Sequence, residues 1–155
     1  MTHAERRARI VEIARAEKGA GRVEEYWKDV LGPSWVGPHP QHWCGAFALW
    51  CLHQAGIAHD VRWVVGKGFL YHLHTKDPWR AQAGDIVYFD KPYQHHAIFA
   101  DRIGATIDTI DGNQPGVTER LRHLTGGIAV FDITPLLPAE TPTDPCPPPE
   151  EGPNA

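Results

Sequence analysis

The segment CGAFALWCLHQA, residues 44–55, constrains the fold of this chain more than any other part of the sequence. It is apolar on almost every side of a helix, which is typical of a helix that lies in the centre of a domain and is covered all round. Gly56 follows and predicts the end of this helix. The chain has 155 residues, 42% of them apolar and 22% charged, which is enough for one globular domain around the helix.

The flanking segments predict further helices before this one and strands after it. Residues 4–18 place apolar side chains among Arg and Glu at helical spacing, residues 23–31 form a second short helix, and the prolines of residues 32–41 prevent its continuation. After Gly84, Pro and Gly turns separate four expected strands, at residues 85–89, 95–101, 106–111 and 127–133. Helices first and strands second predict an α+β domain with an antiparallel sheet packed on the central helix.

Charge and composition exclude several kinds of protein. Lys and Arg number 15 against 19 Asp and Glu, without a basic run, which argues against nucleic acid as a partner. No run approaches the roughly 18 apolar residues of a membrane helix, so membrane insertion is not expected. Residues 1–20 lack the apolar centre of a secretion signal, which predicts synthesis in the cytoplasm. No P-loop or dinucleotide glycine pattern occurs, and no cofactor is expected.

The composition changes at residue 138. Seven of the 14 prolines and four acidic residues lie in residues 138–155, without Lys or Arg. Such a segment cannot bury enough apolar surface to offset its ordering entropy. We therefore expect a folded domain over residues 1–137 and a disordered Pro-rich acidic tail over residues 138–155, with Cys146 exposed in it.

Cys44 stands at the start of the expected central helix, directly after the loop broken by prolines. Its sulfur would lie among unpaired N–H groups at the positive end of the helix dipole, which lowers a thiol pKa. The same N–H groups could later receive an oxyanion. The alternative is a buried structural cysteine, since Cys is often found in protein cores. For Cys51, two turns further along, that alternative is favoured.

A thiolate nucleophile needs a base, and the base needs a group that orients it. His95 and His96 begin the expected strand HHAIFAD, and the strand TIDTID runs back beside it. A three-residue loop at residues 102–104, with its glycine in the left-handed region, avoids a positive φ at a β-branched residue. This loop pairs Asp101 with Ala105, His96 with Ile110 and His95 with Asp111. His95 and Asp111 then share one face, with Asn113 further along it; an ordinary polar surface is the alternative.

A metal site is a second interpretation of the histidines. His72 with His74, His95 with His96, and His39 with His42 could supply ligands. Neither CxxC nor HExxH occurs, however, and a zinc site normally has three or four ligands at recognisable spacing. We therefore expect no metal.

Four segments, HWCGAFALWCLHQAG, AGDIVYF, HHAIF and IDGNQ, resemble in order and separation the CHAP domains of the NlpC/P60-like, papain-related cysteine peptidases and amidases. The resemblance spans roughly residues 4–133 and implies a papain-like fold. It implies that Cys44 is the nucleophile, that His95 is the base, and that Asp111 and Asn113 orient the imidazole. The family usually has a small or branched apolar residue where His96 stands, so a one-residue slip of the base stays open; strand parity favours His95.

The resemblance also implies a function, namely cleavage of amide bonds in bacterial peptidoglycan through a thioester. The bond would join sugar to peptide or lie within the stem peptide or its cross-bridge. The oxyanion would meet the Cys44 N–H and a second donor, Tyr26 or Gln41, while Trp43 would line the cleft. Without a signal peptide, the enzyme would reach the wall as a phage lysin or an injected effector, with a delivery or immunity partner.

Two other functions remain open on the sequence. A papain-like protease or acyltransferase acting on a protein would use the same residues. A non-catalytic cell-wall-binding module would keep the fold without the chemistry. Within the catalytic interpretation, we expect His95→Ala to be as damaging as loss of Cys44, and His96→Ala to lose little.

Overall fold

The structure is a computed structural model that describes residues 1–36, 42–61, 69–70 and 73–141. Its described helices are α1 (His3–Ala16), α2 (Val23–Leu31), α3 (Cys44–Gln54) and the short 3-10 helices η2 (Pro78–Arg80) and η3 (Thr134–Leu136). Its described strands are β1 (Thr75–Lys76), β2 (Ile86–Phe89), β3 (His95–Ile103), β4 (Thr106–Asp111), β5 (Thr118–His123) and β6 (Ile128–Phe131).

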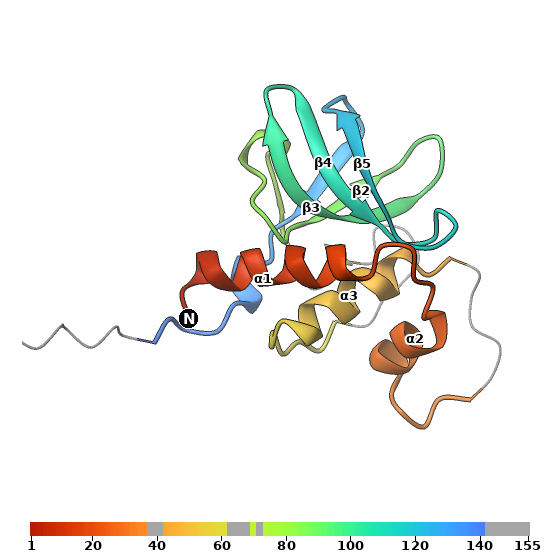
Figure 1. The fold of residues 1–155 in the computed structure, drawn as a ribbon. Helices are drawn as coiled ribbons and strands as arrows, with labels where there is room; N and C mark the ends of the chain where they lie inside the picture. Colours follow the sequence, from red (N-terminus) through yellow and green to blue (C-terminus); the bar gives the residue numbers. More distant parts are fainter. Residues whose placement is uncertain (37–41, 62–68, 71–72, 142–155) are drawn as a thin grey trace, which may run out of the picture.

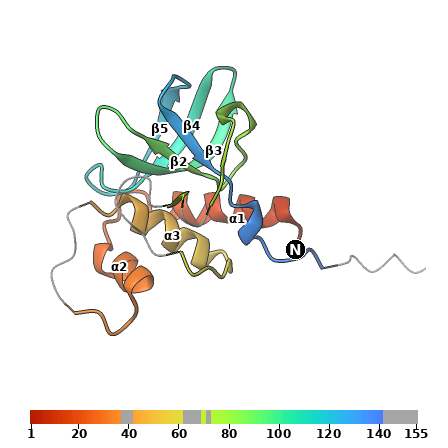
Figure 2. The same ribbon diagram turned by 180° about the vertical axis from the view of Figure 1, so that it is seen from behind.

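The strands form one antiparallel sheet in the order β1-β6-β2-β3-β4-β5. Helices α1 and α3 lie against one face of this sheet, and α2 packs beside α3 (Figure 1). The view from behind shows the same two layers (Figure 2). The expected α+β class with helices packed on an antiparallel sheet is therefore confirmed.

Sequence signals mark several of the helix ends, although α1 ends at Ala16, before the expected residue 18. At the start of α1, the Glu5 N–H donates to the Thr2 hydroxyl at 3.1 Å, and the Thr2 N–H donates to the Glu5 carboxylate at 2.7 Å. This capping box satisfies two of the free donors of the helix end. Helix α2 has the expected bounds, and Gly56 follows α3 at a φ of 74°.

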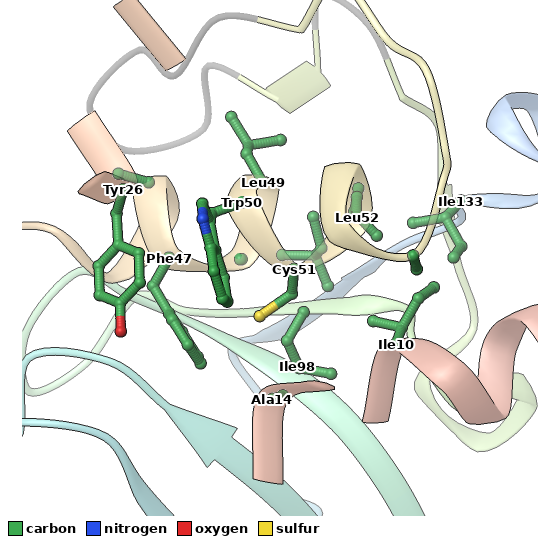
Figure 3. Close-up of a cluster of buried hydrophobic side chains, with 14 of the residues drawn as sticks. Ile10, Ala14, Tyr26, Phe47, Leu49, Trp50, Cys51, Leu52, Ile98 and Ile133 are labelled. Carbon is green, nitrogen blue, oxygen red and sulfur yellow. The ribbon is translucent and has the colours of Figure 1, made fainter. Parts of the chain in front are cut away.

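The core lies between α3, α1 and the near face of the sheet. Figure 3 shows Cys51 with its sulfur among apolar side chains, including Ala14 of α1 and Ile98 of β3. Cys51 is fully buried, and burial raises the pKa of its thiol well above the usual value. Cys51 is therefore a core residue, as expected.

The other face of the sheet carries a smaller apolar cluster. Val87 and Phe89 of β2 pack there with neighbours from β3 and β4, while Tyr88 and Ile86 belong to the core under the helices. All four residues of β2 are buried, so this strand is apolar on both faces. A run such as IVYF is typical of a strand in that position.

The β3–β4 hairpin differs from its expected register. Ile103 pairs with Thr106, so the loop is Gly104-Ala105 and has two residues, with Gly104 at a φ of 60°. Starting the loop at Gly104, two residues later than expected, puts the positive φ on glycine without a third loop residue. A bulge then separates Phe99 from Asp101. The expected pairs were wrong: Asp101 lies opposite Asp108, and Ile110 lies opposite Ile98.

The register error leaves the expected face unchanged. Beyond the bulge, the pair Ile98 with Ile110 is displaced by two positions from the expected pairing of His96 with Ile110. A displacement of two residues keeps every side chain on its face, because side chains alternate with a period of two. His95 and Asp111 therefore still share a face.

Residues 138–141 of the expected tail lie beside the start of α1. The His3 ring Nε2–H donates to the Pro138 carbonyl at 2.9 Å, and the His3 backbone N–H donates to Glu140 at 2.7 Å. The rest of the tail, including Cys146, lies outside the described residues. Among the helices that the structure describes, none has the length and apolar character needed to cross a membrane.

Candidate active site

Cys44 is the first residue of α3 and presents its sulfur at the helix N-terminus. The first helical hydrogen bond runs from the Phe47 N–H to the Trp43 carbonyl at 2.9 Å, and the side chain of Trp43, the N-cap residue, forms no capping hydrogen bond. The N–H groups of the first turn therefore have no partner within the helix. Together with the helix dipole, they favour negative charge at Cys44 and provide donors for an oxyanion.

Gly112 lets the end of β4 approach this helix N-terminus closely. A Cβ at this position would lie 2.8 Å from Cζ3 of Trp43, which is closer than real Cβ contacts, and 3.0 Å from Cβ of Phe47, which is tighter than most of them. Only glycine fits without a shift of the helix or the strand. The contact holds Asp111, the residue before Gly112, beside the first turn of α3.

His95 and Asp111 form a buried hydrogen-bonded pair across β3 and β4. The His95 Nε2–H donates to Oδ2 of Asp111 at 2.8 Å, and the Asp111 side chain is fully buried. The His95 ring lies over Phe89 of β2, with the ring centroids 6.2 Å apart and an interplanar angle of 24°. The ring is thus fixed on one side by an apolar neighbour and at one nitrogen by a carboxylate.

Two further side chains hold the Asp111 carboxylate. The Thr109 hydroxyl donates to Oδ1 of Asp111 at 2.6 Å, and Arg122 of β5 forms an ion pair with Oδ2. Arg122 also donates from Nε to the Thr109 hydroxyl at 3.2 Å, and its guanidinium lies 4.5 Å from the centre of the Phe89 ring. Every oxygen of Asp111 therefore has a partner, as a buried charge requires.

These contacts set the charges of His95 and Asp111. Burial raises the pKa of Asp111, but the hydrogen bonds from His95 and Thr109 and the nearby charges of His95 and Arg122 outweigh it, and the pKa is lowered. Burial lowers the pKa of His95, but the hydrogen bond to Asp111 and the interaction with Cys44 raise it to about 9. At neutral pH, His95 is therefore an imidazolium beside an ionised Asp111.

The Cys44 sulfur interacts with both histidines. Burial raises the pKa of the Cys44 thiol, but hydrogen bonding to His95 and, to a smaller degree, to His96 lowers it to about 6. Since Nε2 of His95 is bound to Asp111, Nδ1 is the nitrogen available to the sulfur. Nδ1 of His96 lies 3.8 Å from Sγ. The expectation that His96 has little part in the site is not supported by this geometry.

The arrangement can perform nucleophilic chemistry at neutral pH. With pKa values of about 6 for Cys44 and about 9 for His95, the pair exists there as a thiolate and an imidazolium. The thiolate is the nucleophilic form of cysteine, and the imidazolium can give its proton to a leaving group. Asp111 keeps the ring oriented and stabilises its charge.

The structure does not bring the other expected residues to the sulfur. Tyr26 is fully buried and its hydroxyl donates to Glu17 at 2.7 Å, so it does not serve as the second oxyanion donor. Trp43 is 6% exposed and packs on Tyr26, with 5.5 Å between the ring centroids, and so belongs to the core and does not line a cleft. Gln41 lies outside the described residues.

Asn113 is also placed differently from the expectation. It follows the end of β4 in the left-handed region, at a φ of 64°, which Asn tolerates better than most residues. Among the hydrogen bonds of the described residues, none joins Asn113 to His95. Asn113 therefore shapes the turn after Asp111, and within the described residues it is the Asp111 carboxylate that is hydrogen-bonded to His95.

Arg122, Thr109 and Gly112 were missed on the sequence. Strand β5 reads TERLRH, and its mixed charges give no apolar alternation, because an edge strand has little of its surface in a core. Thr109 stands two residues before Asp111, so both side chains lie on the same face of β4. This spacing could have indicated that Thr109 contacts Asp111. Gly112 gave a weak signal as an isolated glycine at a strand end.

Among the residues that the structure describes, no group of three or more His, Cys, Asp or Glu side chains is arranged to hold a metal ion. His74 and His42 are exposed, while His39 and His72 lie outside the described ranges. Comparisons with protein-family models, with curated proteins and with solved structures give no match to this chain. The geometry of Cys44, His95 and Asp111 is therefore the basis on which a function can be proposed.

Proposed function

We propose that this chain is a cysteine-dependent hydrolase, a CHAP-like domain of papain-like fold that cleaves amide bonds of bacterial peptidoglycan. The observation that carries this proposal is the placement of Cys44 at the start of α3, with Nδ1 of His96 3.8 Å from its sulfur and with its thiol pKa lowered by His95, whose Nε2 is bound to the buried Asp111. A central helix packed on an antiparallel sheet, with the nucleophile at its N-terminus, supports the papain-like fold.

The reaction begins with the thiolate of Cys44. The sulfur attacks the amide carbon, and the carbonyl oxygen becomes an oxyanion at the free N–H groups of the α3 N-terminus. The His95 imidazolium gives its proton to the amide nitrogen as the carbon–nitrogen bond breaks, which leaves a thioester and a neutral imidazole. Water then gives a proton to His95 and adds to the thioester carbon, and the carbon–sulfur bond breaks to release the acid and restore the ion pair.

The choice of peptidoglycan comes from the sequence resemblance, since the same residues could act on a protein. The order of the four resembling segments matches a family whose chemistry is amide cleavage in the cell wall. A protein-directed protease or acyltransferase is the rival within enzymes. A non-catalytic wall-binding module is disfavoured by the ionised Cys44 and His95, because a binding module has no need of a reactive thiolate.

The experiment is mass analysis of defined peptidoglycan fragments after incubation with the purified protein, with Cys44→Ala as the control. We expect products in which one water has been added across one amide bond, between sugar and peptide or within the peptide part. Their masses identify the bond. Fragments that stay intact while a protein substrate is cleaved, or products that carry a new acyl linkage, would overturn the proposal in favour of the rival enzymes.

A further inference from the structure

His96 lies on the helix-facing side of β3, where its ring is enclosed by aromatic side chains. It is 1% exposed, with its ring centroid 5.1 Å from that of Tyr88 and 4.9 Å from that of Phe69. Tyr88 is its direct partner across the β2–β3 ladder. A ring held in this way has a fixed orientation, and that orientation directs Nδ1 to within 3.8 Å of the Cys44 sulfur.

His95 and His96 approach the sulfur from different faces of the same strand. His95 is bonded to Asp111 on the face that carries Phe89, whereas His96 lies with Tyr88 in the layer under the helices. Adjacent residues of a strand point to opposite faces. Both rings can reach Cys44 because His95 and His96 are the first two residues of β3, and the N-terminus of α3 lies beside the start of that strand.

We propose that His96 is a second catalytic histidine, which donates its Nδ1–H to the Cys44 thiolate while His95 exchanges its proton with the substrate. This inference rests on the proposed function, since it assigns a role in the same reaction. A histidine at this position departs from the small or branched apolar residue of the resembling family, so the contact is a feature of this chain.

The role of His96 follows from what happens to charge during the reaction. During hydrolysis of the thioester, His95 first takes a proton from the attacking water, and the bonding electrons then stay with sulfur when the carbon–sulfur bond breaks. A donor that is not involved in this transfer stabilises the departing thiolate throughout. The His96 ring neither gains nor loses a proton in the step.

The other ionisable groups of the described structure near the site have partners of their own or lie away from the sulfur. On the opposite face, the charges of Asp111 and Arg122 are paired with each other and with His95. The hydroxyl of Tyr88 donates to Asp90 at 3.4 Å, and the first turn of α3 contains no acidic residue. His95 and His96 are thus the two ring donors that the described structure brings to Sγ.

The test is the pH dependence of Cys44 alkylation by iodoacetamide, which needs no substrate. Wild type, His96→Leu and His96→Asn are compared in a Cys146→Ser background, and modification is located by peptide mass analysis. At pH 6.5 we expect His96→Leu to react about threefold more slowly, because a rise of one unit from a thiol pKa of about 6 lowers the thiolate fraction at that pH by about this factor. His96→Asn, whose amide nitrogen occupies the position of Nδ1, should recover part of the rate.

His95→Ala and the double variant His95→Ala/His96→Leu complete the set. His95→Ala should be alkylated faster at pH 6.5 than the double variant, because His96 still stabilises the Cys44 thiolate in it. The proposal is overturned if His96→Leu follows the wild-type curve, or if folded His96→Asn loses as much rate as folded His96→Leu. Circular dichroism checks the folding of each variant.

If the His96 variants do not fold, the wild-type ring itself is measured. In ¹⁵N-histidine NMR at one pH, Cys44→Ala should change the Nδ1 chemical shift of His96, and an unchanged His96 Nδ1 shift overturns the proposal. Failure of the proposed function is a separate result. If alkylation depends on His96 but peptidoglycan is not cleaved, the role of His96 stands and the proposed substrate is wrong. If peptidoglycan is cleaved but alkylation does not depend on His96, the proposed substrate stands and the role of His96 is wrong.

Discussion

Arg122 forms an ion pair with Asp111 through Oδ2, the same carboxylate oxygen that accepts the hydrogen bond from His95. Thr109 binds the other oxygen and is itself held by Arg122. The carboxylate that orients His95 is therefore positioned from the edge strand β5. In the proposed reaction, Arg122 would act through Asp111, as a positioning residue.

Loss of Arg122 should slow catalysis without weakening substrate binding. In Arg122→Gln, the Asp111 carboxylate loses its ion pair and can rotate away from His95. A small misplacement of a catalytic group can cost about 10²-fold, so we expect kcat to fall by about that factor with KM unchanged. Steady-state kinetics on a cleaved muropeptide measures both constants.

Arg120→Gln is the matched control for this prediction. Arg120 is an exposed arginine on the same strand, paired with Thr109 across the ladder. It should keep the wild-type kcat. Equal effects of the two substitutions, or a change in KM alone at Arg122, would show that Arg122 does not position Asp111.

The pH dependence of kcat/KM should be bell-shaped. Activity rises as the pH passes about 6, because the Cys44 thiol loses its proton, and falls near pH 9, because the His95 imidazolium loses the proton that the leaving amine needs. The two values belong to the coupled pair of groups. Initial rates measured from pH 4 to 11 test this, and a profile that stays flat well above pH 9 would remove His95 as the general acid.

Gly112→Ala should destabilise the domain and reduce activity. The added Cβ would lie 2.8 Å from Trp43 and 3.0 Å from Phe47, so the end of β4 must move away from α3. Overpacking of this kind costs about 1–3 kcal/mol in the free energy of unfolding. Urea unfolding measures that loss, and the rate of Cys44 alkylation reports the change at the site.

Gly126→Ala is the control for the packing effect. A Cβ at Gly126 meets nothing within 4 Å, and the residue is exposed. Its unfolding free energy and alkylation rate should match the wild type. If Gly112→Ala is as stable as Gly126→Ala, the close approach of β4 to α3 does not position the site.

The parts of the fold that were predictable are those fixed by local patterns. The apolar run of α3, the bounds of α2 and the strand β4 follow from periodicity and from glycine and proline. The shared face of His95 and Asp111 was predictable even with a wrong loop, because an error of two residues does not change which face a side chain takes.

The parts that were missed depend on contacts between distant segments. Arg122 lies on a charged edge strand. It reaches Asp111 through the pairing of β5 with β4, and no local pattern in the sequence predicts that pairing. Strand alternation predicts that His96 points away from the face of His95 and Asp111. Its contact with Cys44 arises because α3 begins beside the start of β3, where residues on both faces of the strand are within reach.

The dependence of peptidoglycan cleavage on Cys44 tests the central claim most directly. We would measure kcat/KM on a purified muropeptide for wild type, Cys44→Ala and Cys51→Ala. With Cys44 as the nucleophile, its loss should reduce the rate at least about 10³-fold, while Cys51→Ala, in the core, should keep a rate near wild type. A Cys44→Ala protein that is folded and cleaves at the wild-type rate would contradict the account.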